Sequence, residues 1–165
     1  MAGSHAVIGM VAWSWAAPHL GLPPLAPAAL ALACAGALLP DIDHPRSWVG
    51  LRLGIVSRPI AAALGHRGFT HSLLAALACL LLLHDEGASR AIAAPLVVGY
   101  LSHLVADLLT PGGLPLAWPL KRRFSLPLCR TGSLLEPLIV AGLALGTAAA
   151  PLALPWKLLR TVMKY

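Results

Sequence analysis

Residues 91–109 read AIAAPLVVGYLSHLVADLL, a nearly uninterrupted apolar segment from which the fold class can be predicted. Within it, His103 and Asp107 are the only side chains of the Asp, Glu, Lys, Arg and His set, and both lie near its C-terminal end. A helix needs about 20 mostly apolar residues to cross the hydrocarbon core of a bilayer. Lipid permits only helices or closed barrels to cross it, and the chain shows no period-2 barrel pattern. We therefore predict a membrane-spanning helix here.

The rest of the chain has the same apolar character. It has 165 residues, of which 58% are hydrophobic and only 11% are charged, and its mean hydropathy is +0.79. Soluble domains carry about 25% charged residues, so this composition indicates lipid as the surrounding solvent. We predict a single membrane-embedded domain over residues 1–165 that ends in a basic tail at 155–165.

Further hydrophobic segments flank this predicted helix, at residues 4–17, 27–39, 69–83 and 134–154. We predict an all-α, polytopic membrane bundle of about four to five hydrophobic helices. The first three of these segments are shorter than a full span and are expected to be partial spans or to lie in a thinned bilayer. Residues 49–64 are expected to form an interfacial amphipathic helix within a connecting segment. No Lys or Arg precedes the first segment, so we expect it not to be a cleaved signal peptide.

Basic residues gather in two connecting segments, 40–68 and 110–133. If all five segments cross the membrane, these two connections lie on one face, and the positive-inside rule makes that face cytoplasmic. The net charge of +6 favours anionic phospholipid headgroups as neighbours, and no motif for reading nucleic acid accompanies it. The basic residues on this face are Arg46, Arg52, Arg58, Arg67, Lys121, Arg122, Arg123 and Arg130.

Ionisable side chains cluster at the segment ends that this topology brings to the cytoplasmic face. Such groups are costly within a membrane and are kept where they pair, bind a ligand or line a wet cavity. His103 and Asp107 are four residues apart, so both project from one helix face. Asp41 and Asp43 would point the same way in an extended segment. The convergence predicts a divalent metal site formed by His5, Asp41, Asp43, His71, His103, Asp107 and Glu136.

Each of these elements also has a structural interpretation when taken alone. Asp41 and Asp43 suit a turn after a helix, and His103 with Asp107 suits a helix end. A carboxylate at Glu136 would stabilise the positive end of a helix dipole. Thr70 is a candidate helix N-cap, and His5 is an ordinary polar residue near a terminus.

Three motifs in this order resemble the YdjM-like family: PDIDH at 40–44, HRGFTHS at 66–72 and HLVAD at 103–107. The resemblance covers about residues 3–140, and the SHA motif at 4–6 resembles an early histidine of the family. Members are described as metal-dependent hydrolases of the inner membrane, and some are linked to LexA control. The resemblance implies an inner-membrane hydrolase that uses these histidines and aspartates.

The chemistry that we expect is hydrolysis of a phosphoester, with a lipid phosphate as a candidate substrate. Mixed His and Asp ligands suit Zn²⁺ or Mn²⁺, and a carboxylate-rich set suits Mg²⁺; a bound ion would make hydroxide available near neutral pH. His66 would be a ligand or a general acid, and Arg67 and Arg46 would stabilise developing negative charge. Two alternatives stay open: a non-catalytic module stapled by metal, and a protein that translocates ions or protons.

Overall fold

The structure is a computed structural model that describes residues 2–65, 67–120, 122–128, 133, 138, 140–142 and 144–147. Within this part of the chain all regular elements are helical, as predicted, and the single β-bridge joins Leu114 to Phe124. The elements are α1 (Ala2–Ala16), η1 (Ala17–Leu20), α2 (Pro27–Leu38), η2 (Pro40–Asp43), α3 (Trp48–Arg52), α4 (Gly54–Leu64), η3 (Phe69–His71), α5 (Leu73–Asp85) and α6 (Arg90–Leu108).

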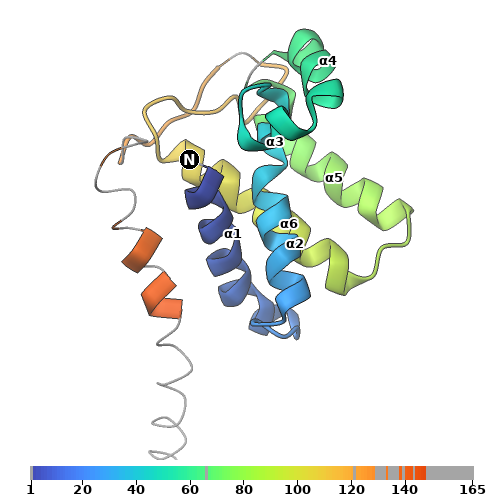
Figure 1. The fold of residues 1–165 in the computed structure, drawn as a ribbon, viewed down its shortest axis with the longest axis vertical. Helices are drawn as coiled ribbons and strands as arrows, with labels where there is room; N and C mark the ends of the chain where they lie inside the picture. Colours follow the sequence, from blue (N-terminus) through green and yellow to red (C-terminus); the bar gives the residue numbers. More distant parts are fainter. Residues whose placement is uncertain are drawn as a thin grey trace, which may run out of the picture.

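Helices α1, α2 and α6 pack against one another and form the centre of the molecule (Figure 1). Small residues let their backbones approach closely, as is usual between helices in membranes. A Cβ atom added at Gly99 of α6 would lie 2.0 Å from the carbonyl oxygen of Ala33, and one at Gly36 of α2 would lie 2.1 Å from that of Leu96. Glycine is therefore required at both positions, and the α2–α6 distance is fixed by backbone contact.

Only α6, Arg90–Leu108, is long and apolar enough to cross a membrane among the described helices. Helix α1 has 15 residues, α2 has 12 and α5 has 13. Proline limits two of them, because η1 follows α1 with Pro18 near its start and Pro40 follows the end of α2. The predicted bundle of four to five spans is thus not confirmed. Most of segment 134–154 and all of the tail 155–165 lie outside the described residues.

Helix α5 begins four residues later than the segment predicted from Phe69. A 3₁₀ turn, η3, occupies Phe69–His71, and Ser72 caps the helix by accepting a hydrogen bond from the Ala75 N–H at 3.2 Å. The predicted N-cap at Thr70 was therefore wrong. The reason is that the Thr70 hydroxyl donates instead to the buried carboxylate of Asp43.

The segment predicted as an interfacial amphipathic helix is helical, but in two pieces. Helices α3 and α4 meet at Leu53, and Ser47 caps α3 while its hydroxyl also donates to the Asp41 carbonyl at 2.8 Å. A Cβ at Gly50 would lie 2.0 Å from the His44 carbonyl oxygen, so α3 sits directly on the backbone that follows η2. Figure 1 shows both helices at the end of the bundle where the C-terminus of α2 lies.

Candidate metal centre

The structure brings five of the seven predicted metal ligands together. One ligand atom each from Asp41, His71 and His103 lie within 4.8 Å of one another, and the same holds for His5, His103 and Asp107. These residues come from α1, η2, η3 and α6, which are distant in sequence. The two groups share His103, so they form one cluster, which we call the His/Asp cluster: His5, Asp41, His71, His103 and Asp107.

His103 owes its orientation to the close approach of α2 and α6. It lies one turn beyond Gly99, is fully buried, and its Nδ1 is 2.7 Å from the carbonyl oxygen of Ala37. That carbonyl belongs to the last turn of α2, where backbone acceptors lack partners within the helix. A carbonyl can only accept, so Nδ1 carries the proton and the Nε2 lone pair of the neutral ring faces the cluster.

His71 is held in the same way by a carboxylate. Its Nδ1 lies 3.2 Å from Oδ2 of Asp43, and both side chains have no exposed surface. Thr70 donates to that same oxygen, and the Tyr100 hydroxyl on α6 donates to the Thr70 carbonyl. A carboxylate on the second ring nitrogen is the usual partner of a metal-binding histidine, and it leaves Nε2 of His71 turned toward His103.

The two aspartates of the PDIDH motif therefore take different places. Pro40–Asp43 is a 3₁₀ turn and not the extended segment that we predicted, so Asp41 and Asp43 do not project side by side. Asp41 Oδ1 is 3.9 Å from Nε2 of His71 and 4.0 Å from Nε2 of His103, so this carboxylate faces both imidazoles. Asp43 lies behind His71, where it orients the ring.

Asp107 contacts three other members of the cluster and also Arg67. Its Oδ2 is 3.8 Å from Nε2 of His71, 3.9 Å from Nε2 of His103 and 2.9 Å from Nη2 of Arg67. Its Oδ1 is 3.5 Å from Nε2 of His5, whose ring stacks on His103 with centroids 4.0 Å apart. The carboxylate is buried, and these cationic or polar neighbours compensate for its removal from water.

Arg67 reaches the cluster from a strained backbone position. Its φ of 54° is left-handed, which is uncommon for a residue other than glycine. The guanidinium lies over Gly112, where an added Cβ would come within 2.6 Å of Nη1. Side chains held in such conformations concentrate at functional sites. Arg67 and Asp41 also reach the molecular surface, because 23% and 21% of their side chains are exposed.

The separation of the two imidazole nitrogens fits one divalent ion, and their separations from each carboxylate come close to it. The Nε2 atoms of His71 and His103 are 3.3 Å apart. Nitrogen or oxygen ligands at about 2.0–2.2 Å from a tetrahedral ion lie roughly 3.3–3.6 Å from one another. The distances from Asp41 and Asp107 to these nitrogens, 3.8 to 4.0 Å, are a few tenths of an ångström longer. Each carboxylate would therefore have to move slightly inward to share an ion with the two nitrogens.

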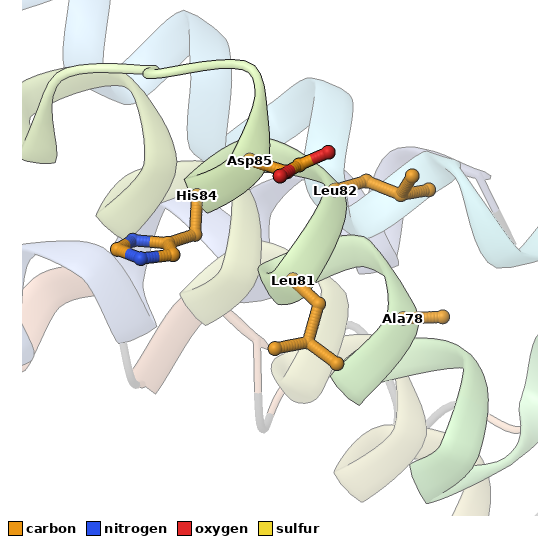
Figure 2. Close-up of a pocket in the computed structure, with 5 residues that line it drawn as sticks. All are labelled: Ala78, Leu81, Leu82, His84 and Asp85. Carbon is orange, nitrogen blue, oxygen red and sulfur yellow. The ribbon is translucent and has the colours of Figure 1, made fainter.

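Of the remaining predicted site residues, two are not described and one lies apart from the cluster. His66 and Glu136 lie outside the described residues. Arg46 is exposed, and its backbone N–H donates to Nδ1 of His44 at 3.1 Å. A depression along α5 is lined by residues of that helix alone, including His84 and Asp85 (Figure 2). It contains no member of the His/Asp cluster.

Sequence reasoning missed the groups that orient the histidines. The contact to the Ala37 carbonyl is made by the backbone, so no residue type in the sequence indicates it. The roles of Thr70 and Tyr100 depend on how η3 packs against α6. The available signal was spacing: Tyr100 precedes His103 by three residues, which places both on one side of a helix. Thr70 is adjacent to His71 in sequence.

Comparison with known proteins finds a family match over nearly the whole chain. The sequence profile of a family described as "YdjM inner membrane protein" matches residues 1–163. The chain is 48% identical over 126 residues to the inner membrane protein YdjM of Escherichia coli (strain K12), and equally to that of Shigella flexneri. Each of these matches covers 72% of this chain and 64% of the relative, so the chain spans just under two thirds of their length.

A more distant relative matches over most of both chains. The protein YvsG of Bacillus subtilis (strain 168), named as uncharacterized, is 37% identical over 145 residues, which is 87% of this chain and 89% of that protein. No solved structure matches the chain.

Proposed function

We propose that this chain, which belongs to the YdjM family of inner membrane proteins, is a metal-dependent hydrolase that acts on a phosphoester. The proposal rests above all on the two facing imidazoles. His71 and His103 present Nε2 atoms 3.3 Å apart while both Nδ1 atoms contact acceptors. With both rings neutral, the two Nε2 lone pairs would face each other at that separation, and a cation between them would turn their repulsion into binding.

His71, His103, Asp41 and Asp107 would hold the ion. Zn²⁺ and Mn²⁺ suit this mixture of imidazole and carboxylate, and Mg²⁺ is the third candidate. When bound, such an ion supplies acidified water, so that hydroxide is available near neutral pH. Asp43 and the Ala37 carbonyl fix the two rings, so the ligand atoms need little rearrangement when the ion arrives.

Arg67 is the candidate anion-binding residue. Its guanidinium matches the geometry of phosphate oxygens, and in the structure it is paired with Asp107 at 2.9 Å. A substrate phosphate would compete for this guanidinium and leave Asp107 to the metal. His66 precedes Arg67 in the sequence and stays our candidate proton donor for the leaving group.

A lipid phosphate is the substrate class that we favour. The exposed edge of the cluster is formed by Asp41 and Arg67, at the end of α6 and not at its middle. In a multi-pass protein with the basic connections inside, that end lies at the cytoplasmic surface of the inner membrane, at headgroup depth. This placement does not favour ion translocation, which needs access from both faces.

Phosphate release from purified protein tests the proposal. The full chain in detergent is incubated with phosphatidic acid, an isoprenyl diphosphate and a lipid extract, each with Zn²⁺, Mn²⁺ or Mg²⁺. Products are followed by mass spectrometry. We expect turnover by the wild type and a loss of at least about 100-fold in Asp107→Asn, with no change in Asp85→Asn, a matched carboxylate on the exposed end of α5.

One observation favours a second candidate function, in which the metal only stabilises the packing of the helices. His71 and His103 have no exposed surface, and Asp107 is 2% exposed, as in a closed structural site. Metal removal would then unfold the protein while no substrate turned over. Unchanged lipid and phosphate composition in all incubations, together with unfolding by chelator, would favour this candidate over the hydrolase.

A further inference from the structure

Helix α4 has its polarity reversed relative to a helix on the surface of a soluble protein. It buries Ser57 completely, while Ile55 is 93% exposed and Val56 is 47% exposed. Pro59, Ala62, Ala63 and Leu64 are also exposed and apolar, and Arg58 is the exposed polar residue of the helix. Water would oppose this arrangement, because each exposed aliphatic side chain forgoes the free energy of burial. The outward face of α4 therefore suits an apolar surrounding.

The charges that flank this face are all of one sign. Arg52 and Arg58 are exposed, and the sequence from residue 44 to residue 84 contains no Asp or Glu. Arg52 also stacks over the ring of Trp48, 3.7 Å from its centroid, and Trp48 is 50% exposed. Tryptophan and arginine together are typical of helices that lie at the membrane–water interface.

We propose that α3 and α4 form a membrane-surface element that lies on an anionic lipid interface. The outward face, Leu51, Ile55, Val56, Pro59 and Ala62, enters the acyl boundary, and Arg52 and Arg58 contact lipid phosphates. Charge decides between lipid and a second copy of the chain. A second copy docked through the same face would bring arginines against arginines, whereas anionic lipid supplies the opposite charge that this segment lacks.

The element bears on the His/Asp cluster through its packing. Helix α4 packs against η2, which carries Asp41. If α4 rests at the interface, η2 and the exposed edge of the cluster are kept at the depth of the headgroups. The inference does not depend on metal binding or hydrolysis, and the experiment below measures neither.

The depth of residue 55 tests the proposal. Ile55→Cys is introduced in a chain that also carries Cys34→Ala, Cys79→Ala and Cys129→Ala, labelled with the fluorophore NBD, and reconstituted in vesicles. Glu86→Cys, at the exposed end of α5, is the matched control. With vesicles that contain phosphatidylglycerol, we expect blue-shifted emission at position 55 and quenching by lipids brominated near the headgroup. Position 86 should emit as in water.

Two results at position 55 would overturn the proposal. Emission as in water would show that α4 faces solvent, and blue-shifted emission without quenching by brominated lipid would show that protein covers it. Quenching by brominated phosphatidylglycerol should exceed that by brominated phosphatidylcholine several-fold, and this preference should fall in Arg52→Gln with Arg58→Gln.

The unmodified chain provides a second test should the cysteine-free variant not fold. A photoreactive phosphatidylglycerol should label the tryptic peptide 53–67 of the wild type more strongly than a photoreactive phosphatidylcholine. Labelling confined to α5, with none on that peptide, would contradict the proposal.

Discussion

Gly99→Ala should damage the His/Asp cluster although residue 99 touches none of its members. A Cβ at this position would lie 2.0 Å from the Ala33 carbonyl oxygen, and such contacts are not observed below 3.0 Å. Helices α2 and α6 must therefore separate by about 1 Å. The bond from His103 Nδ1 to the Ala37 oxygen, now 2.7 Å, would lengthen to roughly 3.7 Å, which is no longer a hydrogen bond.

The expected cost combines two effects. Overpacking at a tight contact costs about 1–3 kcal/mol, and the loss of a buried hydrogen bond costs about 1–3 kcal/mol. We therefore expect the free energy of unfolding to fall by roughly 2–6 kcal/mol. Loosening of the ring that carries a ligand atom should lower metal affinity by about 10- to 100-fold.

Unfolding in detergent and titration with a metal-competing dye measure these two quantities. Gly54→Ala is the control, since a Cβ there meets nothing within 4 Å. A Gly99→Ala protein with wild-type stability and wild-type metal affinity would refute the idea that backbone contact between α2 and α6 positions His103.

Three further outcomes are expected. Asp43→Asn should lower metal affinity by about 10- to 100-fold, because the amide can still accept a hydrogen bond from His71 but lacks the charge of the carboxylate. The helical content measured by circular dichroism should not change. Unchanged metal affinity would show that Asp43 does not support the site. Arg67→Ala should retain bound metal but weaken inhibition by inorganic phosphate at least about tenfold, and loss of the metal itself would show that Arg67 is structural. With free metal at 1,000 times its dissociation constant, bound metal should add about 4 kcal/mol to the free energy of unfolding, and a chelator should remove this contribution. The unfolding of His103→Ala should not depend on the chelator.

Much of the site could be predicted from the sequence, because the direction of successive helices and the spacing of residues along them were sufficient to place the ligands. Successive helices that reverse direction return their ends to the same level, and His103 and Asp107 are one turn apart on α6. That reasoning needed no side-chain detail, and it placed His5, Asp41 and His71 beside them.

The features of the site that could not be predicted depend on details of helix packing that are finer than the length of a side chain. The separation of α2 and α6 is set by Gly36 and Gly99, whose role appears only when the two helices are placed together. The different roles of Asp41 and Asp43 follow from the 3₁₀ turn of η2. The sequence PDID is compatible with both an extended segment and a turn, so these roles could not be predicted from it. Helix ends depended on local hydrogen bonds, as the cap at Ser72 shows.

Metal content of the intact protein tests the central idea most directly. The chain is purified from membranes with a tag that contains no histidine, and bound Zn, Mn and Mg are measured by elemental analysis beside His103→Ala and Asp41→Ala. We predict about one divalent ion per wild-type chain and its loss from both variants, with circular dichroism unchanged. A wild type that binds none of these ions in their presence, or variants that keep the full content, would contradict the assignment of the His/Asp cluster as a metal centre.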